Sequence, residues 1–166
     1  MSAELERRVR ALETQLAGFR SAGRPRYVFA TYTPTYRGTG TAGSVTYTQQ
    51  IGRYVRLNEI AIVWGRIAWS NVTGSPTGDG IITLPFALRS VTNLVIAATL
   101  SADSLDFTGA YVSGIVNTST VSVSGVNVGY ITCIAHAATT GNATAIGVVT
   151  AADVKFTAVM PIDDTA

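Results

Sequence analysis

The chain has 166 residues, 47% of them hydrophobic and only 13% charged, and its net charge is +2. That length allows one domain with a short extension, and the small charge argues against general nucleic-acid binding, which depends on clustered Lys and Arg. A single cysteine, Cys133, excludes an intrachain disulfide, and no apolar run approaches the ~20 residues of a membrane span.

Residues 2–20 predict a helix with one apolar seam. The seam has the spacings 4, 3, 4 and 3 of a heptad repeat and consists of Leu5, Val9, Leu12, Leu16 and Phe19. A helix of fewer than three heptads is marginal alone in water, so the seam needs partners. We therefore expect residues 1–22 to form an oligomerisation and anchoring stem. Residues 23–26 form a linker, in which Arg24-Pro25 ends the helix.

Charged residues beside the seam favour three chains. Arg8 at a g position and Glu13 at the next e position can form an ion pair between chains. The stretch 8–13 also resembles a short trimerisation motif: Arg, an apolar residue, two variable residues, an apolar residue and Glu. The sequence thus predicts a homotrimeric coiled coil. The alternative is an amphipathic helix that docks on its own domain.

From Tyr27 onward, β-branched and aromatic runs alternate with Gly, Pro, Asn and Asp. These runs predict strands at 27–33, 44–50, 53–57, 59–69, 81–84, 94–100, 110–116, 120–124, 128–135, 145–149 and 153–160. So many strands without an intervening helix predict an all-β knob over residues 27–166, an antiparallel β-sandwich or jelly roll.

The run Ile60–Trp64 is apolar at every position, so neither face of this strand suits water. We expect a central strand, or one that covers the core on one face and a neighbouring subunit on the other. Residues 153–160 differ, because apolar residues alternate there with Lys155 and Thr157. That alternation predicts a half-buried strand.

The residues that catalysis would need are scarce. His136 is the only histidine, and Cys133, three residues earlier, would lie on the opposite face of a strand. No Gly-x-Ser-x-Gly, P-loop or dinucleotide fingerprint occurs. We therefore predict a protein that is not an enzyme and that has no cofactor and no metal site.

Four residues beside turns are the candidates to face a ligand. Tyr36 and Tyr111 adjoin Gly-rich or Ser-rich turns, where exposed rings could stack on sugars. Asp103 and Asp106 share a Ser-rich loop. The two carboxylates could serve a glycosidase or, with Ser104, bind calcium; a solvated surface loop is the preferred interpretation.

A family resemblance lies between Tyr32 and Phe86. The segment contains Tyr-Thr-x-Gln-x-Gly-x-Tyr-Val at 47–55, Val-Trp-Gly-Arg-Ile-Ala-Trp at 63–69 and Leu-Pro-Phe at 84–86. It resembles a β domain that recurs in bacteriophage tail-fibre, head-fibre and capsid-decoration proteins. The resemblance implies that these residues are structural, that the N-terminal part anchors to the particle, and that a trimeric knob faces outward.

These features together predict a non-enzymatic virion protein: a homotrimeric surface appendage, either a capsid decoration or head spike or a short fibre. Its stem would bind other virion proteins, and synthesis would take place in the host cytoplasm, since the N-terminus does not resemble a secretion signal. The alternative is a receptor- or carbohydrate-binding knob of a tail fibre that contacts a host surface glycan. A polysaccharide hydrolase is a third hypothesis. Neither nucleic-acid binding nor membrane insertion is expected.

Overall fold

The computed structural model describes residues 8, 10, 27–89, 96–103, 111–136 and 143–162. Ten strands in this part form one sheet: β1 (Tyr27–Tyr32), β2 (Tyr36–Gly38), β3 (Ser44–Leu57), β4 (Ile60–Thr73), β5 (Gly80–Thr83), β6 (Ile96–Asp103), β7 (Tyr111–Val123), β8 (Val126–His136), β9 (Ala143–Ala145) and β10 (Ala152–Pro161). Their order is β1-β3-β4-β10-β6-β7-β8-β5-β2, with β9 beside β8. Every pairing is antiparallel, which confirms the all-β prediction.

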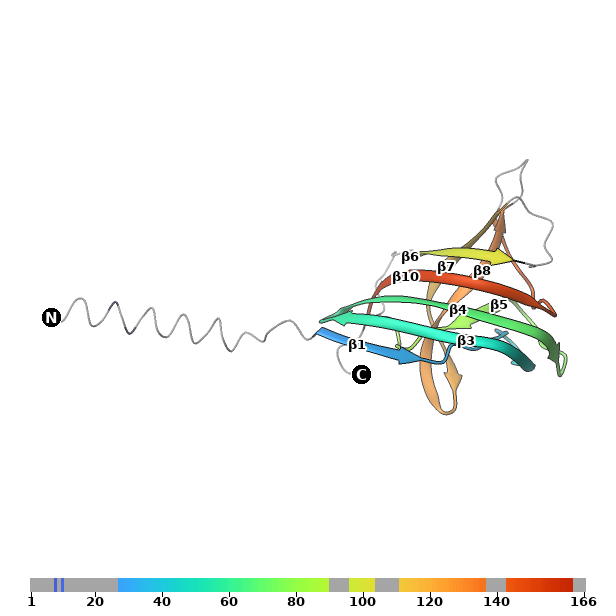
Figure 1. Ribbon diagram of the computed structural model, residues 1–166, viewed down its shortest axis with the longest axis horizontal. Helices are drawn as coiled ribbons and strands as arrows, with labels where there is room; N and C mark the ends of the chain where they lie inside the picture. Colours follow the sequence, from blue (N-terminus) through green and yellow to red (C-terminus); the bar gives the residue numbers. More distant parts are fainter. Residues whose placement is uncertain are drawn as a thin grey trace.

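The sheet curls into a half-barrel. Strands β1, β3, β4, β10 and β6 form one wall in Figure 1, and β7, β8 and β5 lie across from them. Hydrogen-bonded pairing continues from β10 through β6 and β7 to β8, so one bent sheet encloses the core. The predicted two-layer sandwich or jelly roll is therefore replaced by a single continuous sheet.

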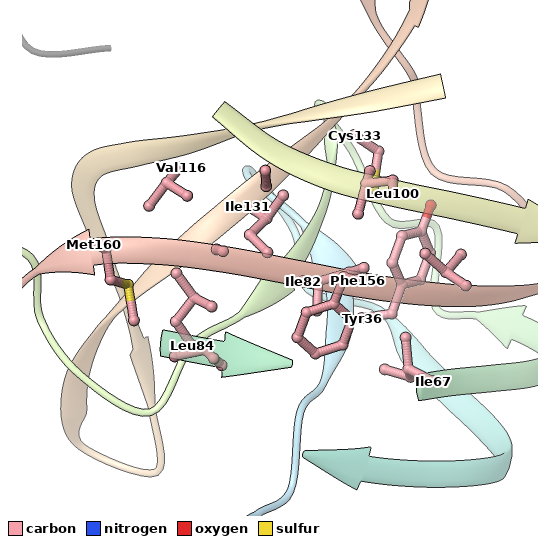
Figure 2. Packing of buried hydrophobic residues seen from close by; sticks show 14 of the residues in the cluster. Tyr36, Ile67, Ile82, Leu84, Leu100, Val116, Ile131, Cys133, Phe156 and Met160 are labelled. Carbon is pink, nitrogen blue, oxygen red and sulfur yellow. The ribbon is translucent and has the colours of Figure 1, made fainter. Parts of the chain in front are cut away.

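The core lies between the two walls. Ile67 of β4 and Phe156 of β10 meet Ile82 of β5 and Ile131 of β8 (Figure 2). Alternate residues of β10 are buried from Ala152 to Met160, as the sequence pattern predicts. Burying a large apolar side chain of this kind contributes roughly 1.5–3 kcal/mol, so the enclosed face supplies much of the driving force for the curl.

Several strand boundaries differ from the prediction. The segments 44–50 and 53–57 form one continuous strand, β3, and the segments 110–116 and 120–124 join in β7 with an irregularity between Asn117 and Val121. The three-residue strand β2 was too short for a sequence pattern to reveal. Strand β9 precedes the predicted segment 145–149 and shares only Ala145 with it.

Gly52, in the middle of the motif at 47–55, lets β3 pass beneath an aromatic ring. Tyr32 is its cross-strand partner, and the ring of Tyr32 occupies the space that a Cβ at position 52 would take. Two residues further along β3, the Tyr54 ring lies edge-on to Phe86, with centroids 4.7 Å apart. The motif thus ties β1 and the Leu-Pro-Phe turn to β3 by packing.

Tyr36 attaches the far edge of the sheet, β2, to the opposite wall. Its ring stacks on Trp69 of β4 with centroids 4.0 Å apart, and its Oη accepts a hydrogen bond of 2.9 Å from the Val149 amide. The hydroxyl of Tyr47 accepts from the Tyr36 amide at 2.8 Å and donates to its carbonyl at 3.1 Å. Tyr36 is only 2% exposed, so the prediction of a ligand-facing ring is wrong.

We expect Gly52→Ala to lower the free energy of unfolding by about 1–3 kcal/mol, because the added methyl group must displace the Tyr32 ring from a packed site. Gly147→Ala is the matched control, since no described atom lies within 4 Å of the position of its Cβ. Urea unfolding followed by circular dichroism measures both changes. Equal effects of the two substitutions would contradict the proposed role of Gly52.

Two buried tyrosines give an internally controlled comparison. Tyr36→Phe leaves the Val149 amide without its acceptor, and we expect a loss of about 1–3 kcal/mol in unfolding free energy. The Tyr32 hydroxyl is buried and has no hydrogen-bond partner among the described residues. Tyr32→Phe should therefore leave stability unchanged or raise it slightly, since it removes a buried unsatisfied group. Unfolding curves that rank the two variants in the opposite order would refute this assignment.

Candidate functional site

The predicted coiled-coil seam lies outside the described residues. This holds for Leu5, Val9, Leu12, Leu16 and Phe19, and also for Glu13. Arg8 and Arg10 are described, and both are helical and exposed. The stem, its trimeric state and the Arg8–Glu13 ion pair therefore remain predictions.

The predicted ligand-facing residues do not form a site in the described part of the chain. Asp106 lies outside it. Asp103 ends β6, and Tyr111 begins β7 opposite His136 of β8; only the backbone of these three residues is described. Of the four predicted ligand-facing residues, only Tyr36 has a described side chain, and that side chain is buried.

The described residues contain no group of three or more His, Cys, Asp or Glu that could hold a metal ion. Burial raises the pKa of the Cys133 thiol to about 12, so this side chain stays protonated and unreactive near neutral pH. Cys133 is 2% exposed and packs in the core as a small hydrophobic residue.

The outer face of β1, β3, β4 and β10 carries the most unusual surface of the described chain. One cross-strand row contains Phe29, Val55, Ile62 and Val159, and the row nearer the start of β1 contains Leu57 and Ile60. We define the apolar band as Phe29, Val55, Leu57, Ile60, Ile62, Trp64 and Val159. Phe29 and Val159 are each 54% exposed and Ile60 is 50% exposed, so the band is open to solvent in the single chain.

Pairing explains why apolar side chains collect there. Successive side chains of a strand point to opposite faces, so Ala61 and Val63 enter the core while Ile60, Ile62 and Trp64 face outward. The expectation of a central strand is confirmed, because β4 lies between β3 and β10; the neighbouring subunit expected on its outer face remains a prediction. The Trp64 ring also lies against Phe29, with ring centroids 6.0 Å apart. This contact links Trp64 to the row that contains Phe29.

Charged side chains border the apolar band at both ends. Arg53 pairs across strands with Trp64, and beyond it Arg66 forms a two-pronged ion pair with Asp153, with 2.9 Å between Nε and Oδ1. At the end near the start of β1, Arg89 Nη1 lies 2.6 Å from Glu59 Oε2. An apolar centre that contains aromatic residues, inside a charged rim that contains Arg, is the composition of a protein–protein interface.

A hollow of about 310 Å³ adjoins the band beside Trp64. Its lining is mostly apolar, and besides Trp64 the residues around it include Phe156, Thr99, Ser101, Lys155 and Thr157. An aromatic ring next to hydroxyl and ammonium groups suits the apolar and polar faces of a sugar ring. Trp64 is partly exposed, so a sugar contact here is an alternative to the subunit contact that the run 60–64 predicts.

Sequence reasoning did not identify Phe29, Leu57 and Val159 as surface residues. For Val159 a signal was present, because the outward positions of β10 change from Lys155 and Thr157 to an apolar residue. Phe29 and Leu57 gave no local signal, since only strand pairing places them beside β4 and β10.

No protein-family model, curated protein or solved structure matches the chain. The described residues contain no helix that is long and apolar enough to cross a membrane. Residues 32–86, which carry the resemblance to phage β domains, run from Tyr32, the last residue of β1, through β5 to the segment after it. Their motif residues pack and hydrogen-bond within the half-barrel, in keeping with the structural role that the resemblance implies.

The Asp153–Arg66 pair predicts a definite pH dependence. The hydrogen bond that Arg66 donates to the Asp153 carboxylate lowers the pKa of Asp153 below its ordinary value of 3.8. When a carboxyl group has a lower pKa in the folded chain than in the unfolded chain, its ionised form stabilises the fold at pH values above the unfolded-state pKa. This stabilisation is lost as the pH falls through the folded-state pKa. For a surface pair it is below about 1 kcal/mol.

We therefore expect the Asp153 carboxyl, followed by NMR, to titrate below the ordinary range, and to return toward it in Arg66→Gln. The difference in unfolding free energy between the parent chain and Asp153→Asn should vanish below the folded pKa. A normal Asp153 titration in the parent chain would show that the pair does not persist in solution.

Proposed function

We propose that this chain is a non-enzymatic structural protein, the subunit of a homotrimeric appendage on the surface of a bacteriophage particle. The appendage would be a capsid decoration or head spike, or a short fibre. The observation that carries the proposal is the apolar band, a solvent-exposed interface-like surface that begins where residues 1–26 join β1. Such a surface suits assembly with other protein.

The predicted stem supports the same assembly from the sequence side. Its heptad seam requires partner helices, and residues 20–26 connect it directly to Tyr27, the first residue of β1. Figure 1 shows β1 beginning and β3 ending at the same end of the knob. A stem that gathers three chains would therefore gather three copies of the apolar band.

The phage location rests on the resemblance over residues 32–86, not on the apolar band. Within the trimer hypothesis, the stem would bind other virion proteins and the curled sheet would form the outward knob. The work of such a subunit is mechanical, because it reinforces the particle or presents a surface to the host. The virion surface and host-cytoplasmic synthesis belong to this proposal.

The alternative, a carbohydrate-binding knob, is favoured by the hollow beside Trp64. Its indole and surrounding hydroxyls offer both stacking and hydrogen bonding to a sugar. Glycan-array binding that disappears on Trp64→Ala would support this alternative. This alternative requires the hollow to stay open to solvent in the assembled protein, so it competes with any subunit contact at Trp64.

The trimer itself is tested by comparing Leu12→Asp with Thr14→Asp in the full chain. Leu12 lies at a d position of the seam, and Thr14, two residues later, lies at the outward f position. We expect the parent chain and Thr14→Asp to have three times the subunit mass of 17.4 kDa by light scattering. Leu12→Asp should reduce that mass, because it places a carboxylate in the seam.

A parent chain that stays monomeric at micromolar concentration would overturn the proposal. So would a Leu12→Asp variant that keeps the parent mass together with the parent thermal stability, since the seam would then be dispensable for assembly.

A further inference from the structure

We propose that the apolar band is a second interface between subunits: in the trimer, the bands of the three copies turn toward the common axis and cover one another. This inference rests on the homotrimer proposed above and names the partner of the band as another copy of this chain. The stem would bring the chains together, and the band would orient the knobs.

The first argument is the exposure of the band in the single chain. Phe29 and Val159 lie in one cross-strand row and are each 54% exposed, with Val55 and Ile62 between them. No charged residue belongs to the band, and the flanking carboxylates Asp153 and Glu59 are each paired with an arginine. A second copy could therefore pack on this surface without burying an unpaired carboxylate.

The second argument is the length of chain between the seam and the band. Seven residues, 20–26, lie between Phe19, the last seam position, and Tyr27, so the two are eight residue steps apart, and an extended chain spans at most about 3.6 Å per step. The start of β1 therefore lies within about 29 Å of the last seam residue. Tyr27 pairs with Leu57, a member of the band, so the tether joins the knob at the near row of the band.

The third argument is size. Neighbouring strands lie about 4.8 Å apart and alternate residues of a strand about 6.7 Å apart, so a band of four strands and three rows covers roughly 200–350 Å². A stable interface buries about 800 Å² on each partner. The band is thus too small to hold two free chains together, but a tethered interface needs far less area because the local concentration of the partner reaches the millimolar range.

The band has two other conceivable occupants. One is the N-terminal helix of the same chain folded back on the sheet, and the other is a different protein. The helix cannot line a coiled-coil seam and cover the band of its own chain at once. The mass of the oligomer and the protection of the band from a thiol reagent, measured together, therefore identify the occupant.

The test introduces one thiol at a time into the full chain. The native Cys133 is 2% exposed and its thiol pKa is raised to about 12, so it is nearly silent in thiol labelling. Val159→Cys places a thiol in the band, at the β10 end of the cross-strand row that begins with Phe29. Val126→Cys is the matched control, because Val126 is also an exposed strand valine, 62% exposed, and lies after the turn at Ser124-Gly125, away from the band.

We expect the thiol of the Val159→Cys trimer to react with a maleimide at least tenfold more slowly than the thiol of the Val126→Cys trimer. Equal rates in the two trimers would overturn this inference and leave the proposed function standing. If Val159→Cys is monomeric and its new thiol is protected, the chain's own helix is the occupant, and both proposals are overturned. Both proposals would also be overturned if the parent chain and Val159→Cys were both monomeric and the new thiol reacted freely.

A charge substitution provides the second measurement. Val159→Asp should raise the concentration at which the trimer dissociates by at least tenfold, because three carboxylates would meet at the covered bands. Val126→Asp should leave that concentration unchanged. If both substitutions have the same effect, the band contributes nothing specific to the assembly.

Discussion

The architecture depends on the attachment of β2 to the opposite wall through Tyr36. A sheet of this many strands would otherwise remain open and leave its inner face in water. The Tyr36 ring stacks on Trp69, and its hydroxyl and backbone are bonded to Val149 and Tyr47. These contacts join β2, at one end of the strand order, to β3 and β4 near the other end, and the apolar inner faces become a core.

This closure also determines which surface is left for contacts with other molecules. Once the inner faces of β4 and β10 are committed to the core, their outward residues face solvent. On most of the wall these residues are polar or charged, but near the start of β1 they are apolar on four adjacent strands. The same strand pairing thus builds both surfaces: the inward side chains form the core, and the outward side chains form the apolar band.

The sequence predicted what local patterns determine and missed what long-range contacts determine. Alternation correctly located β10, and the unbroken apolar run Ile60–Trp64 correctly indicated a central strand. Gly52 suggested a break because glycine weakens strands, yet here it accommodates Tyr32, which pairing alone brings above it. Tyr36 adjoins a Gly-rich turn and was expected to be exposed, but its hydroxyl partner, Val149, lies 113 residues later in the chain.

The same distinction applies to the candidate site. The run Ile60–Trp64 indicated that an apolar outer face exists, whereas Phe29 and Val159 become part of it only through strand order. The predicted ligand-facing residues were chosen for their nearness to turns. Nearness to a turn says nothing about burial when the turn itself packs against the opposite wall, as it does beside Tyr36.

In the proposed trimer, neither the stem nor the apolar band suffices alone. The stem has fewer than three heptads, and a helix of that length is marginal unless its seam is fully used. The band covers well under the area of a standard interface. Each interface raises the local concentration of the partner surface at the other, so each strengthens the other. The low charge of the chain favours this coupling, because little electrostatic repulsion opposes the approach of three knobs.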